Sequence, residues 1–69
     1  MDGDFRISLK AARVNAHLTQ YQAAKALGVS KQTILGWEHG YSSPTISKAK
    51  ELAKLYSCPL QRINFCLKD

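Results

Sequence analysis

Three adjacent polar side chains, Lys31, Gln32 and Thr33, carry the groups of this chain that are best suited to recognising another molecule. They follow Ser30, a good N-terminal cap, so they would project from the first turn of a helix. A lysine ammonium can donate to guanine, a glutamine carboxamide can pair with adenine, and a threonine methyl suits the methyl of thymine. These side chains could enter a groove of a nucleic acid, or they could simply be the solvated start of a helix.

The residues around this group predict two short helices joined by a tight turn. Thr19 and Gln22 have the spacing of a capping box, which would start a helix over residues 20–27. Gly28 stands where that helix should end, because the left-handed conformation that closes a helix is nearly free of strain only for glycine. A second helix then runs over residues 31–39. So short a connection makes the helices cross steeply, which is the helix-turn-helix arrangement.

The rest of the chain has the apolar spacing of three further helices. We predict them over residues 8–16, over residues 46–56 behind the cap Thr45, and over residues 60–65. No segment alternates apolar and polar residues as a half-buried strand does. We therefore expect an all-α fold of five helices.

Length and charge limit the class of protein. The 69 residues make one domain, 1–69, with residues 1–6 as a flexible arm and residues 65–69 as a tail. The net charge is +5, from ten lysines and arginines against five acidic residues. Residues 5–68 carry all ten basic and only two of the acidic side chains, a balance of +8. A basic surface favours nucleic-acid binding, although a merely solvated surface has the same composition.

Several other classes are excluded by composition. The two histidines and the cysteines Cys58 and Cys66 lack metal-ligand spacing, so we expect no metal, no cofactor and no structural disulfide. No carboxylate pair, supported nucleophile–histidine set or glycine-rich phosphate loop is present, so we expect no catalytic residues and no enzyme. No apolar run approaches the ~18 residues of a membrane helix, and we expect a soluble, cytoplasmic protein.

From about Leu9 to Ile63 the chain resembles the Cro/repressor-like helix-turn-helix family, also called the XRE family. The matching residues are Leu9, Lys10, Arg13, Leu18, Thr19, Gln20, Ala24, Leu27, Gly28, Val29, Ser30, Thr33, Ile34, Trp37, Glu38, Gly40, Pro44, Leu52 and Ala53. The resemblance implies a lambda-repressor-like domain in which the third helix lies in the major groove of DNA. The chain departs from the family at Ser57 and Pro59, where most members have glycine and a capping serine.

The resemblance assigns expected roles to individual residues. The positions that meet base edges in the family are occupied here by Lys31, Gln32, Thr33 and Gly36. Gly36 lacks a side chain, so either the backbone approaches the DNA there or fewer bases are read. Contacts to phosphate position a protein without specifying the sequence. We expect such contacts from Thr19, Gln20, Ser30, His39, Tyr41, Ser42 and Ser43, with an ordinary surface histidine as an equal alternative for His39.

Arg13 and Glu38 match a pair that is structural in the family. There an arginine of the first helix binds a glutamate that ends the third helix. A bidentate arginine–carboxylate pair would hold the reading helix against the first helix. We therefore interpret these two residues as a structural ion pair.

The function that follows is a sequence-specific DNA-binding regulator of transcription, similar to small phage or prophage repressors and Cro proteins. One such domain covers half of a palindromic operator, so we expect a homodimer, at least on double-stranded DNA. The candidate dimer surface is apolar and C-terminal, and it comprises Cys58, Leu60, Phe65 and Leu67. The alternative for this segment is a cap on the core.

A rival function is a protein-interaction module, such as an antitoxin or an anti-repressor partner with the same fold. Its binding surface would include Leu35 or the C-terminal tail. Leu35 could equally make an apolar contact in a DNA groove, and the sequence leaves both possibilities open.

Overall fold

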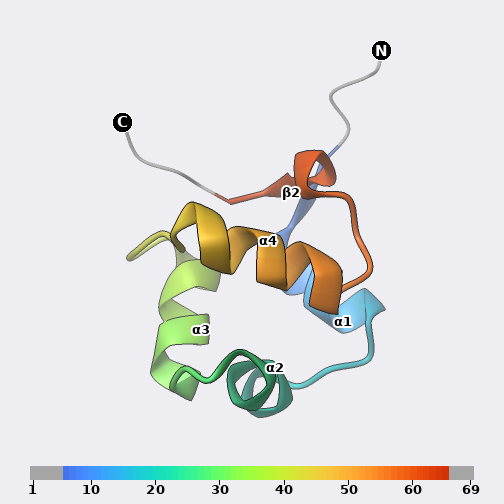
Figure 1. The fold of residues 1–69 in the computed structure, drawn as a ribbon. Helices are drawn as coiled ribbons and strands as arrows, with labels where there is room; N and C mark the ends of the chain where they lie inside the picture. The colour runs from blue at the N-terminus through green and yellow to red at the C-terminus, as the bar shows by residue number, and fades with distance from the viewer. Residues whose placement is uncertain (1–5, 66–69) are drawn as a thin grey trace.

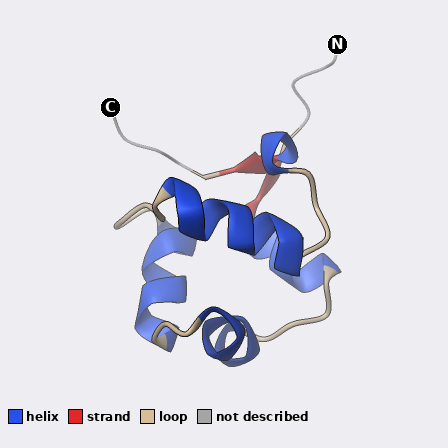
Figure 2. Ribbon diagram, viewed as in Figure 1, coloured by secondary structure: helices blue, strands red, loops and turns tan. Residues whose placement is uncertain are grey.

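The computed structural model describes residues 6–65, in which four α-helices pack together and the two ends of the described chain meet (Figures 1 and 2). In chain order the elements are β1 (Ile7–Ser8), α1 (Leu9–Asn15), α2 (Gln20–Leu27), α3 (Lys31–His39), α4 (Ile46–Leu55), the 3-10 turn η1 (Leu60–Arg62) and β2 (Ile63–Asn64). Figure 1 shows α2 end-on while α3 runs across the view, so these two helices cross steeply, as predicted.

Each α-helix starts behind a serine or threonine whose side chain accepts a hydrogen bond from a backbone N–H in the first turn. The four caps are Ser8, Thr19, Ser30 and Thr45. The backbone N–H of Thr19 in turn donates to the Gln22 side chain at 2.9 Å, which completes the predicted capping box. Because these signals are local, the bounds of α2 and α3 match the prediction. The helix α1 is one residue shorter than predicted at each end, and α4 is one residue shorter at its C-terminal end.

Left-handed residues follow all four α-helices, the first being His17 (φ 62°) after α1. Gly28 (φ 72°) ends α2 and Gly40 (φ 78°) ends α3. Ser57 follows α4 with φ 52°, a conformation that strains any residue with a Cβ atom. The turn in which this chain departs from the family that it resembles is therefore kept, with serine in the place of glycine.

The predicted fifth helix, over residues 60–65, is not an α-helix. Its first residues form the short turn η1, and Ile63–Asn64 then forms β2, which pairs in parallel with β1. Ile63 lies opposite Ile7 in this pairing. Pro59 precedes the turn and supplies no side-chain cap, while the backbone of β1 offers a hydrogen-bonding edge. The expectation of no strand is corrected by the same pairing.

The core lies where α3 and α4 meet α1 and α2. Ile34 and Leu52 are its largest fully buried side chains. Ala23 and Ala24 of α2 are also buried, and their small size lets α2 and α3 approach closely. Phe65, just after β2, belongs to the same cluster. None of the described helices is long and apolar enough to span a membrane.

Candidate nucleic-acid interface

The first turn of α3 presents two long polar side chains to solvent. Lys31 and Gln32 are both exposed. Thr33 is only half-buried, and its hydroxyl lies 2.9 Å from the Ser30 hydroxyl. Of the residues expected to reach base edges, Lys31 and Gln32 therefore have their hydrogen-bonding groups free of the cap, while Thr33 shares its hydroxyl with Ser30.

Gly36, the fourth residue expected at a base edge, lies deeper than the other three. It is buried, and a Cβ atom on it would lie 3.2 Å from the Ser42 hydroxyl oxygen. Its carbonyl accepts the backbone N–H groups of Tyr41 at 2.9 Å and Ser42 at 3.4 Å. The loop after α3 therefore folds over this residue. Gly36 is therefore less accessible than Lys31 and Gln32, and a Cβ atom there would require the Ser42 side chain to move by a few tenths of an ångström.

A buried ion pair between Arg13 and Glu38 holds α3 against α1. The Arg13 Nε lies 2.6 Å from Glu38 Oε2 and the Arg13 Nη2 lies 3.3 Å from Glu38 Oε1, in the bidentate arrangement. The two side chains are 9% and 5% exposed. The Arg13 Nη1 also donates to the Leu18 carbonyl at 2.9 Å, so one guanidinium joins α1, the α1–α2 connection and α3.

Gln20 joins the cluster that Arg13 and Glu38 form, a contact that the sequence did not predict. Its Nε2 donates to Glu38 Oε1 at 3.1 Å, so the first residue of α2 is tied to the end of α3. The residue was expected to contact phosphate, and its amide has a second N–H that this bond does not use. No spacing in the sequence indicates a contact between residues 18 positions apart.

Tyr56 closes the cluster on the side of α4. Burial raises the pKa of Tyr56 to about 12, with a further upward effect of the Glu38 charge and an opposing effect of Arg13. The phenol therefore stays neutral beside the ion pair at physiological pH.

The remaining residues expected at phosphate lie at helix ends near α3. Thr19 and Ser30 are exposed and cap α2 and α3. After α3, the rings of His39 and Tyr41 are stacked, with centroids 5.4 Å apart and 14° between their planes. Tyr41 is 75% exposed, and Ser42 and Ser43 follow it on the surface. This loop thus presents a row of polar groups beside the end of the reading helix.

Among the described residues, the charged side chains that have no ion-pair partner are basic. Both carboxylates, Glu38 and Glu51, are paired with basic side chains. Lys48, the partner of Glu51, also donates to the Leu27 carbonyl at 3.1 Å and so caps the end of α2. Exposed basic side chains remain at Arg6, Lys10, Lys25, Lys31, Lys50, Lys54 and Arg62. A polyanion therefore meets few competing negative charges.

The candidate dimer residues are divided by the structure. Phe65 is buried in the core, Leu60 and Cys58 are half-buried, and Leu67 lies outside the described residues. An apolar hollow of about 150 Å³ lies between α4 and the C-terminal segment. It is lined by Pro44, Ile46, Ala49, Leu60 and Phe65. Ile46 is 70% exposed at its edge, although the sequence analysis did not select it.

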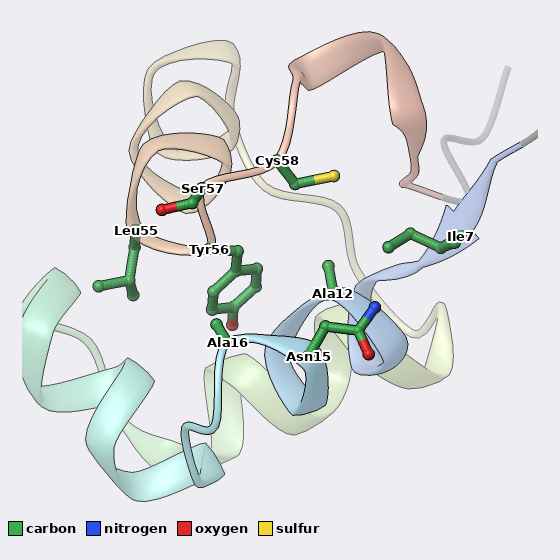
Figure 3. A pocket seen from close by; sticks show the side chains of 8 residues that line it. All are labelled: Ile7, Ala12, Asn15, Ala16, Leu55, Tyr56, Ser57 and Cys58. Atoms are coloured by element: carbon green, nitrogen blue, oxygen red, sulfur yellow. The ribbon is translucent and has the colours of Figure 1, made fainter.

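A pocket of about 450 Å³ lies between the end of α1 and the turn after α4 (Figure 3). Its lining consists of Ile7, Ala12, Asn15, Ala16, Leu55, Tyr56, Ser57 and Cys58. This lining holds one thiol and no base or carboxylate beside it. Within residues 6–65, no group of three or more histidine, cysteine or acidic side chains is placed to hold a metal.

Comparison with known proteins places this geometry in a family. Residues 9–63 match a helix-turn-helix family, and the chain belongs to it. This match confirms the Cro/repressor-like resemblance and covers the four α-helices and η1. No solved structure matches the chain significantly.

Three curated proteins are similar in sequence. The transcriptional repressor RstR of the cryptic phage CTXphi of Vibrio cholerae is 34% identical over 59 residues, which are 86% of this chain and 53% of that protein. An uncharacterised HTH-type transcriptional regulator of Methanocaldococcus jannaschii is 40% identical over 55 residues, or 80% of this chain and 83% of the relative. One of Archaeoglobus fulgidus is 29% identical over 58 residues, with 84% and 82% covered. This chain thus spans about half the length of the phage repressor.

Proposed function

We propose that the protein is a sequence-specific DNA-binding regulator of transcription. The helix-turn-helix family and the names of all three relatives support DNA-binding regulation. The observation that carries sequence specificity is the exposed first turn of α3 on a helix held by the Arg13–Glu38 pair. Base reading requires side chains whose positions are fixed before binding, and this pair supplies the support.

In this mechanism α3 lies in the major groove and α2 crosses the DNA backbone. Lys31 donates to base edges, whereas Gln32 both donates to them and accepts from them. Phosphate contacts come from the N-terminus of α2 and from the loop after α3, where His39 and Tyr41 stack. The exposed basic side chains add an attraction that does not depend on sequence.

The finer form of the proposal is a phage-type repressor that occupies a palindromic operator as a homodimer. The name of the Vibrio cholerae relative supports the repressor class. One domain covers one half-site, and two copies reach half-sites about one helical turn apart. The apolar hollow at Ile46, Leu60 and Phe65 supplies the dimer surface.

Selection of binding sites from a random DNA pool tests this function, because it returns the half-site and the spacing together. We expect Gln32→Ala to lose about 1–3 kcal/mol of preference at one base position while keeping its affinity for unrelated DNA. Binding is measured by fluorescence anisotropy on the selected site and on a scrambled duplex. Gln61→Ala, the same change at an exposed position on η1, is the matched control and should keep the base preference of the parent.

An equal loss on every sequence would mean that Gln32 contacts phosphate. If the pool yields no preferred site and the protein leaves a DNA column at very low salt, the fold is used instead to bind a protein. That outcome would favour the antitoxin or anti-repressor class.

A further inference from the structure

An apolar side chain stands on the polar outer face of α3. Leu35 is 36% exposed. It follows Lys31 by four residues and Gln32 by three, so the three side chains share one face of the helix. Together they line a hollow of about 200 Å³. An apolar residue thus lies within the group that the proposed function assigns to base reading.

The packing of α3 does not account for Leu35. The inner stripe of the helix is filled by Ile34 and Trp37, which are both buried in the core. Leu35 belongs neither to that cluster nor to the apolar residues that pack against it. Its side chain therefore has a free apolar surface that folding leaves uncovered.

Its neighbours on α3 leave the apolar part of base reading to Leu35. Gly36 has no side chain and is covered by the loop at Ser42. Thr33 also carries a methyl group, but Thr33 is half-buried, whereas Leu35 is exposed. Lys31 and Gln32 can satisfy only polar groups of the bases. The one apolar group that base edges present in the major groove is the C5-methyl of thymine.

We propose that Leu35 is a specificity-determining residue that contacts the C5-methyl of a thymine in each half-site. This inference rests on the proposed function and deepens it by naming the base that an apolar side chain selects. The methyl enters the hollow between Lys31, Gln32 and Leu35. The ammonium group of Lys31 and the carboxamide of Gln32 then reach the polar edges of neighbouring bases. Burial of a methyl group against Leu35 removes apolar surface of both partners from water.

The test replaces each thymine of the selected half-site in turn by uracil, which lacks only the C5-methyl. We expect one such replacement to weaken binding by the parent protein about fourfold, the effect of one buried methyl group. Leu35→Ala should weaken binding to the thymine site and abolish most of this uracil penalty. Leu35→Met should keep the penalty, because the longer side chain still covers the methyl.

Val14→Ala is the matched control, since Val14 is an exposed apolar residue on α1. It should show the same uracil penalty as the parent, so that loss of the penalty is specific to Leu35. An effect of uracil on DNA shape would instead leave the penalty in every variant, including Leu35→Ala. Circular dichroism should show that Leu35→Ala keeps the parent helix content, because alanine is a strong helix former.

A uracil penalty that is unchanged in Leu35→Ala would overturn this inference, and so would a parent protein that tolerates uracil at every position. Either result leaves sequence-specific binding intact. Absence of any preferred DNA site would instead overturn the proposed function, so the two failures are distinguishable.

Discussion

Glu38 is the residue on which the geometry of the motif depends. It lies in the last turn of α3 and receives hydrogen bonds from Arg13 of α1 and from Gln20 of α2. A single carboxylate thus ties three helices together at the level of the reading helix. Removal of either charged side chain would leave the other buried without a partner.

Arg13→Met should therefore destabilise the protein by about 3–5 kcal/mol, because it strands the Glu38 charge. This loss is comparable to the ~3–5 kcal/mol that the core of so small a domain supplies. The double variant Arg13→Met/Glu38→Leu should recover much of the loss, since no charge is then buried alone. Urea denaturation followed by circular dichroism measures all three proteins.

The control for this comparison is Glu51→Gln, which removes the exposed ion pair with Lys48. A solvent-exposed pair contributes little, so this variant should stay within about 1 kcal/mol of the parent. A melting temperature of Arg13→Met within a few degrees of the parent would show that Arg13 and Glu38 are not a structural pair.

At the residue scale, resemblance and spacing predicted which residues pair, but not that one side chain binds several partners. The partnership of Arg13 and Glu38 came from matching positions in the family, and the structure brings the two side chains together. The inward turn of Gln20 and the covering of Gly36 had no signal in the sequence. Both depend on how the α3–α4 loop and α2 pack, which residue spacing does not encode.

At the scale of elements, the ends of helices were the best predicted features. A capping serine or threonine and a closing glycine act within one turn of the chain, so α2 and α3 could be delimited from sequence. The segment after Pro59 was predicted as a helix because its apolar spacing is compatible with one. Its pairing with β1 joins residues 56 positions apart, and no local pattern indicates such a contact.

The turn after α4 offers a stabilising substitution. Ser57 is exposed and has φ 52°, where glycine is free of the strain that a Cβ atom causes. We expect Ser57→Gly to raise the free energy of unfolding by about 1 kcal/mol. The measurement is the shift of the urea midpoint at constant slope.

Ser57→Ala serves as the control, because it keeps the Cβ atom and removes only the hydroxyl. It should leave stability close to that of the parent. A Ser57→Gly variant less stable than the parent would mean that the flexibility which glycine adds to the unfolded chain outweighs the relief of strain.

At the scale of the whole molecule, the reading surface and the apolar hollow lie on different elements. The hollow lies between the start of α4 and the C-terminal segment, whereas Lys31, Gln32 and Leu35 stand on α3. A second copy that docks at the hollow would therefore leave the first turn of α3 free. This separation is what a dimer on a palindrome requires.

Ile46→Ser tests that arrangement, because Ile46 is 70% exposed at the edge of the hollow and the change adds no charge that could itself attract DNA. If the hollow is the dimer surface, affinity for the full palindrome should fall by about 10²-fold, since the second half-site no longer binds as part of one association event. Affinity for a single half-site should stay the same, and sedimentation should show fewer dimers.

Val14→Ser, an equally simple loss of an exposed apolar group on α1, should change neither the affinity for the palindrome nor the fraction of dimers. Unchanged binding of Ile46→Ser to the palindrome would place the dimer contact elsewhere on the molecule, whereas an equal loss on half-site and palindrome would make Ile46 part of the DNA contact itself.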